Sequence, residues 1–175
     1  MYDKNISQRF QPHYPALQIN GGLSLFIGWL YFNAASAQTV QSEKNSVGLN
    51  TMCTVISSAS AALSSSIFYH LILFDKTNPT SKHDINQKIN SVLAGCVSIT
   101  AGCNNVSLLG SFWIGLVGGF IYILGVKIFS QVEIDDPLEA SIVHGFCGLW
   151  GVLAVGFFDK DKGLFYSLSF RQIGI

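Results

Sequence analysis

Residues 135–158 of the sequence, DDPLEASIVHGFCGLWGVLAVGFF, decide the fold class of this chain. The nineteen positions from Ala140 to Phe158 contain no Lys, Arg, Asp or Glu. A charge-free segment of this length, together with its flanks, spans the hydrocarbon core of a bilayer, which is about 30 Å thick. The sequence therefore predicts a transmembrane helix over these residues.

His144 lies inside this segment, and we weigh two interpretations of it. A histidine within a helix is often a core residue whose ring nitrogens are satisfied by neighbours. An ionisable residue in a charge-free membrane helix is, in contrast, a functional hypothesis by default. Counted from Pro137, the imidazole lies roughly 10 Å along the helix, and we favour the functional interpretation.

The residues before His144 predict how this helix begins. Asp136 suits the N-cap position, Pro137 the first helical position and Glu139 the third, which together make a capping box with an acidic first turn. Asp135, Asp136 and Glu139 therefore have a sufficient structural explanation as the residues that start the helix.

The composition extends the membrane interpretation to the whole chain. Only 11% of the residues are charged and 49% are apolar, with a mean hydropathy of +0.40, whereas soluble domains carry about 25% charged residues. Ten basic and ten acidic residues balance, so the net charge suggests no nucleic-acid partner. The four cysteines lack metal-site spacing and are interpreted as packing residues, with no metal and no cofactor.

The positions of the charged residues predict an all-α bundle of five transmembrane helices. Four intervals lack Lys, Arg, Asp and Glu, namely 10–42, 45–74, 89–126 and 140–158. The turn-forming cluster Gly102-Cys103-Asn104-Asn105 divides the third interval into two helices. The helices are expected at about 17–37, 48–74, 86–101, 108–129 and 140–158. Residues 1–16 form a polar segment without a signal-peptide pattern, residues 17–158 the membrane domain, and residues 159–175 a polar and aromatic tail.

The first of these helices carries an aromatic cluster near its end. Trp29, Phe32 and Ser36 are spaced by three and four residues and share one helical face. Such aromatic residues alone are typical of an interfacial belt. An aromatic face with a hydroxyl group also suits a small cation, through cation–π attraction and a hydrogen bond.

These motifs together resemble the ammonium transporters, the Amt/Mep branch of the Amt/Rh superfamily. Gly28-Trp29 with Phe32-Asn33-Ala34 and Ser36 is similar to one family segment, and Asn50-Thr51 to the next. Leu93-Ala94-Gly95 through Thr100 is similar to a third segment. The stretch from Asp135 to Gly151, with His144 at its centre, resembles the most specific signature of the family.

The resemblance implies that the five helices correspond to helices six to ten of an eleven-helix fold, in a homotrimer with one pore in each subunit. Ammonium would be deprotonated and would cross an apolar pore as ammonia beside two histidines. Trp29 and Ser36 would serve at the recruitment site, Phe32 as a gating phenylalanine, and His144 as the second pore histidine. Thr100 would be a hydrogen-bonding position in the pore, and Glu139 stands where the family usually has aspartate.

The sequence also departs from the family pattern. His13, His70 and His83 do not match the motif of the first pore histidine, and Tyr31 and Ala35 replace small residues of the aromatic motif. We therefore expect a C-terminal-half fragment of an ammonium transporter, in the plasma membrane. The alternatives are a non-transporting paralogue that joins full-length relatives as a regulatory or structural subunit, and, ranked last, an intramembrane enzyme that uses His144 as a base.

Overall fold

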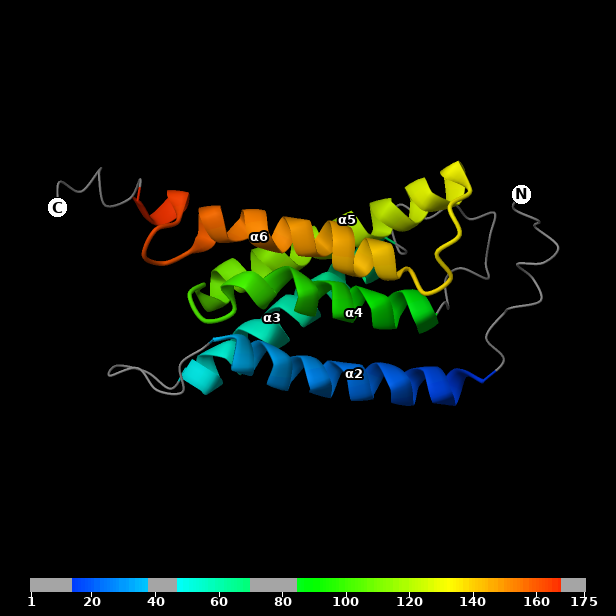
Figure 1. Cartoon of the computed structure of the whole chain (residues 1–175), viewed down its shortest axis with the longest axis horizontal. Helices are drawn as coiled ribbons and strands as arrows, with labels where there is room; N and C mark the ends of the chain where they lie inside the picture. The colour runs from blue at the N-terminus through cyan, green and yellow to red at the C-terminus, as the bar shows by residue number, and fades with distance from the viewer. Residues whose placement is uncertain (1–13, 38–46, 70–84, 168–175) are drawn as a thin grey trace.

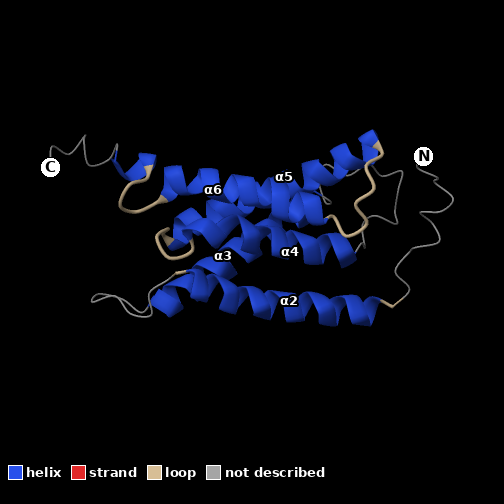
Figure 2. Cartoon of the chain, viewed as in Figure 1, coloured by secondary structure: helices blue, strands red, loops and turns tan. Residues whose placement is uncertain are grey.

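The computed structural model describes residues 14–37, 47–69 and 85–167, which fold into five long helices (Figures 1 and 2). A 3-10 turn, η4 (Thr100–Gly102), follows the third long helix, and a π-helical segment, η5 (Ser141–Phe146), leads into the fifth. The long helices are α2 (Pro15–Ser36), α3 (Val47–Phe68), α4 (Ile85–Ile99), α5 (Leu108–Val132) and α6 (Cys147–Phe158).

The helices form one bundle in which successive elements run in alternating directions (Figure 1). This architecture confirms the predicted all-α fold with five helices. The bounds agree with the expected ranges to within a few residues when η5 and α6 are taken together as the expected 140–158 helix, and α3 is described as far as Phe68. Residues 70–74 of the expected second helix, most of the 1–16 segment and the end of the 159–175 tail lie outside the described residues.

Helix α4 is the inner helix of the bundle. It packs against α2, α3, α5 and α6, and nine of its fifteen residues are buried, among them the run from Leu93 to Ile99. A helix that is surrounded by protein need not match the thickness or the polarity of the lipid. Its burial therefore explains why α4 is shorter and more polar than a single membrane span.

Three helical segments among the described residues are long and apolar enough, by length and composition, to cross a membrane. They are Val47–Phe68, Leu108–Val132 and the continuous segment Ser141–Phe158. At 1.5 Å per residue, the 25 residues of α5 extend about 37 Å. This length exceeds a hydrocarbon core of about 30 Å.

Glycines on α5 bring this helix into close contact with α3. A Cβ atom on Gly115 would lie 2.1 Å from the carbonyl oxygen of Ser58, and one on Gly119 would lie 2.6 Å from the carbonyl oxygen of Ala62. Small residues in an apolar helix permit such a close approach of two backbones. Gly145 of η5 differs, because nothing lies within 4 Å of its Cβ position.

The hydroxyl groups of α3 bond mainly to backbone carbonyls. Ser64 and Ser65 donate to Ser60 and Ala62 of their own helix, whereas the buried Ser58 donates to Gly95 of α4 at 2.9 Å. Bonding to backbone carbonyls therefore satisfies these hydroxyls within the bundle.

The α4–α5 connection is anchored by the segment that follows α6. Val106 and Asp159 form an isolated bridge, and the Asp159 carboxylate accepts hydrogen bonds of 2.8 Å from the backbone N–H groups of Asp161 and Lys162. Burial raises the pKa of this carboxyl group, but these hydrogen bonds and the Lys162 charge outweigh burial and leave the pKa below its ordinary value. The turn is therefore a stable corner of the bundle.

Candidate functional site

The structure brings three of the residues predicted for the site into one aromatic cluster. The rings of Trp29 and Phe32 meet edge to face on α2, with centroids 5.0 Å apart. The His144 ring in η5 is stacked on Trp29, with centroids 6.1 Å apart and planes inclined by 24°. Residues more than one hundred positions apart therefore share one site, and the contact of His144 with Trp29 could not be derived from spacing.

The other two residues predicted for recruitment and the pore, Ser36 and Thr100, donate hydrogen bonds to backbone carbonyls four residues earlier. The Ser36 hydroxyl donates to the carbonyl oxygen of Phe32 at 2.8 Å, and the Thr100 hydroxyl donates to that of Cys96 at 2.9 Å. Thr100 belongs to η4, which packs against both α2 and α6. Its position between these helices is compatible with the predicted pore role, which stays a prediction.

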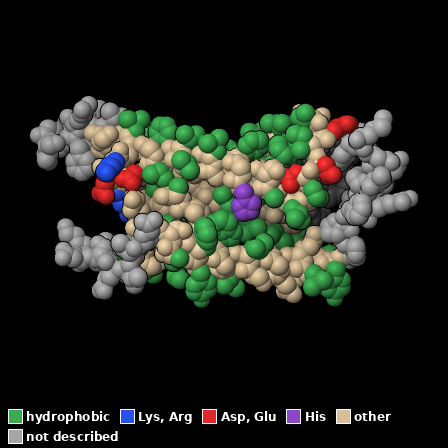
Figure 3. Space-filling model, viewed as in Figure 1, with side chains coloured by type: hydrophobic (Ala, Val, Ile, Leu, Met, Phe, Trp, Pro, Cys, Tyr) green, Lys and Arg blue, Asp and Glu red, His purple; other side chains and the backbone are tan. Residues whose placement is uncertain are grey.

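The cluster lies on an open, mainly apolar face. His144 is exposed in this chain and Phe32 is 55% exposed. The histidine visible in Figure 3 lies between the two ends of the bundle, where the acidic and basic side chains gather. Helices α2 and α3 carry no charged residue within their bounds. A small molecule at the cluster would therefore meet aromatic rings and an imidazole.

The helix before His144 begins differently from the prediction. Glu139 has a left-handed backbone with φ 56°, so the chain becomes helical only from Ala140. The capping-box assignment of Asp136, Pro137 and Glu139 is therefore wrong. The Asp136 carboxylate instead accepts from the backbone N–H groups of Ala140 and Ser141, at 3.1 and 2.9 Å. An acidic residue still stabilises the helix start, but from four and five positions away.

The Glu139 side chain points to two other helices. Its Oε2 accepts a hydrogen bond from the Tyr122 hydroxyl of α5 and a second, of 2.8 Å, from the Asn90 amide of α4. Both donor residues are buried, Tyr122 almost completely. Asp135 is exposed. The three acidic residues that were grouped as helix-start residues thus differ in their structural roles.

Sequence reasoning missed the buried residues that fix α2 against α4 next to the aromatic cluster. Asn33 is fully buried and donates to the Cys96 carbonyl of α4 at 3.3 Å, and its own carbonyl accepts from the Cys103 thiol at 3.3 Å. These bonds fix the end of α2 that carries Phe32. The sequence offered one signal for this role, the polar amide of Asn33 beside the aromatic motif of α2. Asn90 and Tyr122, which are polar residues in charge-free segments, were comparable signals for the contacts of Glu139.

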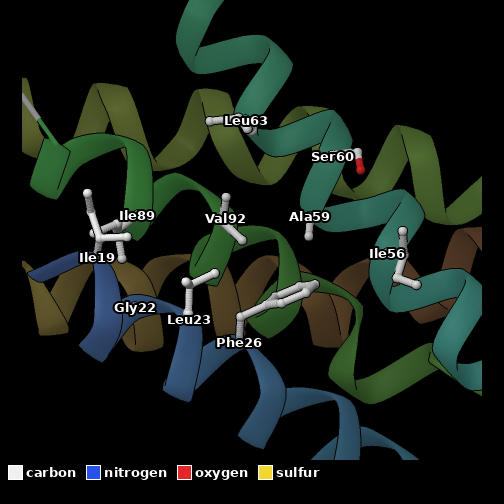
Figure 4. Close-up of a pocket in the computed structure, with 10 residues that line it drawn as sticks. All are labelled: Ile19, Gly22, Leu23, Phe26, Ile56, Ala59, Ser60, Leu63, Ile89 and Val92. Carbon is white, nitrogen blue, oxygen red and sulfur yellow. The ribbon is translucent and has the colours of Figure 1, made fainter. Parts of the chain in front are cut away.

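Two apolar cavities among the described residues have no lining residue from the aromatic cluster. One, of about 320 Å³, lies between α2, α3 and α4 and is lined by apolar side chains such as Leu23, Phe26 and Val92 (Figure 4). A second lies between α5 and α6 and includes Leu124 and Leu149. In the part of the chain that the structure describes, no three His, Cys, Asp or Glu residues are grouped as metal ligands.

Comparison with known proteins identifies the family of this bundle. The profile of the Ammonium Transporter Family matches residues 2–173. The chain belongs to the ammonium transporter family. The resemblance inferred from the His144 and Trp29 motifs is therefore confirmed, and members of this family are integral membrane proteins.

Individual members of the ammonium transporter family are similar over most of this chain. A Synechocystis sp. protein named as a candidate ammonium transporter is 36% identical over 156 residues, which are 88% of this chain and 34% of that protein. The ammonium transporter Amt2 of Archaeoglobus fulgidus is 32% identical over 170 residues, which are 96% of this chain and 34% of Amt2. These relatives are named as transporters and not as enzymes.

A solved structure agrees with the fold. A chain named Sensor Amt Protein superposes with a TM-score of 0.72 at 26% identity, and the match covers 93% of this chain and 40% of that one. This chain spans about a third of the length of the curated ammonium transporters that it matches.

Proposed function

We propose that this chain takes part in the transport of ammonium, or of ammonia derived from it, across a membrane. The stacking of His144 on Trp29, beside Phe32, carries the proposal. It joins the two most specific sequence motifs in one exposed cluster between the charged ends of the bundle. Family membership supports the substrate, because the relatives are named as ammonium transporters.

The chemistry of the cluster suits an ammonium ion that loses its proton. Moving an intact cation into apolar surroundings costs several kcal/mol, whereas neutral ammonia needs only hydrogen-bond partners. In this mechanism Trp29 and Ser36 attract the cation, Phe32 limits access, and the His144 imidazole and the Thr100 hydroxyl offer hydrogen bonds along the passage. Each of these roles is part of the proposal.

We further propose that the cluster is one wall of a pore and that a second set of helices supplies the opposite wall. The open face around His144 supports this arrangement, because rings that are exposed in the chain would be covered when the passage is closed. The complete transporter would be a homotrimer in the plasma membrane, with one passage in each subunit.

A chimera tests this function directly. The segment of Archaeoglobus fulgidus Amt2 that aligns with this chain is replaced by the chain, and uptake of labelled methylammonium is measured in cells that lack their own ammonium transporters. His144→Ala removes the imidazole, and Val152→Ala, on the exposed side of α6, is the matched control. We expect the first variant to alter the uptake rate or ion selectivity and the second to match the parent.

Protein amount and fold are checked in the same membranes, by quantitative blotting and by the elution volume of the purified chimera. A His144→Ala chimera with normal amount, normal elution and unchanged uptake and selectivity would contradict the pore assignment.

A further inference from the structure

Two glutamates in the described residues have left-handed backbones, and only one of them has an ordinary reason for it. Glu133 follows α5 as its C-cap with φ 56°, a position where helices often end in this conformation. Glu139, also with φ 56°, precedes a helix. A left-handed residue with a side chain costs free energy and persists only where its surroundings hold it in place.

The surroundings that hold Glu139 come from two other helices. The Asn90 amide of α4 donates to Glu139 Oε2 at 2.8 Å and to the carbonyl oxygen of Leu138 at 3.2 Å. The Tyr122 hydroxyl of α5 donates to the same Oε2 atom. Backbone and side chain of the turn are therefore held together against the buried side of the bundle.

The turn held in this way is the start of the segment that carries His144. The Glu139 carbonyl accepts from the Val143 N–H at 3.0 Å, and the next hydrogen bonds are π-helical, such as that from the Cys147 N–H to the Ile142 carbonyl. A π turn contains one more residue than an α-helical closure and is frequent at functional sites. The register of this turn decides which side chains face the bundle.

Within η5 this register directs Ile142 and Val143 into the core, where they are 1% and 3% exposed, and Cys147 is fully buried. His144 is left on the open face against Trp29. A shift of this start by one residue would rotate the following helix by about 100° and move the imidazole away from Trp29. The start that the capping box predicted, at Pro137, lies three residues before the observed one at Ala140.

We propose that Glu139, held by Tyr122 and Asn90, is a positioning residue that sets the register of the π turn and so places the His144 ring on Trp29. Its hydrogen-bond acceptors do this work, and its charge is not required. The placement can be tested without transport. Its importance for ammonium conduction rests on the proposed function.

Trp29 fluorescence measures the placement in the full chain. The purified protein in detergent micelles carries Trp113→Phe and Trp150→Phe, so that Trp29 is the remaining tryptophan. A protonated imidazole in contact with an indole quenches its fluorescence. Acidification of the sample therefore gives a quench whose amplitude measures the contact. His144→Phe in this background must abolish the quench; if the quench remains, the contact that carries the proposal is refuted.

The variants separate geometry from charge. Glu139→Ala removes the acceptor and is expected to lose the quench, while Glu133→Ala, with the same left-handed backbone, retains it. Glu139→Gln keeps a carbonyl oxygen for Tyr122 and Asn90 and should also retain it. Tyr122→Phe removes one donor and should reduce the quench. Far-UV circular dichroism confirms that each variant keeps its helical content, and Tyr122→Phe decides the question if Glu139→Ala does not fold.

Full parental quench in both Glu139→Ala and Tyr122→Phe would overturn the proposal. Loss of the quench in Glu139→Gln, to the same extent as in Glu139→Ala, would overturn the claim that the acceptors and not the charge set the register. These results are independent of the methylammonium experiment. A chimera with unaltered transport after His144→Ala refutes the proposed function, whether or not the quench depends on Glu139.

Discussion

Gly115→Ala should separate the two helices that pack most tightly in this bundle. The added Cβ would lie 2.1 Å from the Ser58 carbonyl oxygen and 2.6 Å from two further Ser58 backbone atoms. Ordinary contacts begin at 3.4 Å, so α3 and α5 would have to move apart by about 1.3 Å at this point. Because all three atoms belong to the backbone, no side-chain rotation relieves the clash.

The cost follows from the size of this separation. Overpacking a tight interface costs about 1–3 kcal/mol of stability. Because the added methyl group meets backbone atoms that cannot rotate away, we expect a cost at the upper end of this range, about 3 kcal/mol. Replacing glycine by alanine in a helix returns about 1 kcal/mol of helix propensity. We therefore expect the free energy of unfolding to fall by about 2 kcal/mol.

Gly156→Ala is the matched control, because nothing lies within 4 Å of its Cβ position in α6. It should gain up to about 1 kcal/mol, which separates the two variants by about 3 kcal/mol. Unfolding is followed by far-UV circular dichroism as sodium dodecyl sulfate is added to dodecyl maltoside micelles. If Gly115→Ala unfolds at the same detergent fraction as Gly156→Ala, the close approach of α3 and α5 does not limit stability and the reasoning is wrong.

Two further predictions concern the polar groups at the end of the bundle near the α4–α5 connection. Ser107→Ala should destabilise the protein by about 1 kcal/mol, because the Ser107 hydroxyl caps α5 by accepting from the Gly110 N–H at 3.1 Å; the exposed Ser64→Ala, measured in the same micelles, should change the unfolding midpoint much less. Asp159 has a lowered pKa in the folded chain, so its stabilisation is complete above the unfolded value near about 3.9 and is lost as the pH falls through the folded pKa. Hydrogen exchange of the Asp161 and Lys162 amides should accelerate in that window relative to the unfolded chain, and Asp159→Asn should abolish this pH dependence; equal pH dependence in both proteins would contradict it.

The number and order of the helices could be predicted from local features of the sequence. Each long helix lies mostly within a charge-free interval, although Lys88 falls inside α4 and Lys127 inside α5. The cluster from Gly102 to Asn105 forms the turn that divides two of the helices. The close contact at Gly115 was also predictable, because a small residue in an apolar helix permits backbone approach. These features depend on residues within one or two turns of each other, so spacing alone reveals them.

The start of the His144 helix was predicted incorrectly for a physical reason. Asp136, Pro137 and Glu139 satisfy the local rules for a capping box, and an isolated helix could begin there. Asn90 and Tyr122 offer the Glu139 carboxylate two hydrogen bonds from other helices. Tertiary contacts of this kind override a local capping preference that is worth about 1 kcal/mol.

The sequence by itself determined a five-helix membrane bundle and the family to which it belongs, because hydropathy, segment length and motif order are properties of the linear chain. Only the tertiary structure decided that His144 meets Trp29, that Asn33 anchors α2 to α4, and that Glu139 turns inward. Each of these contacts joins residues at least 49 positions apart. Its existence depends on how the helices pack around α4, which no local pattern of residues specifies.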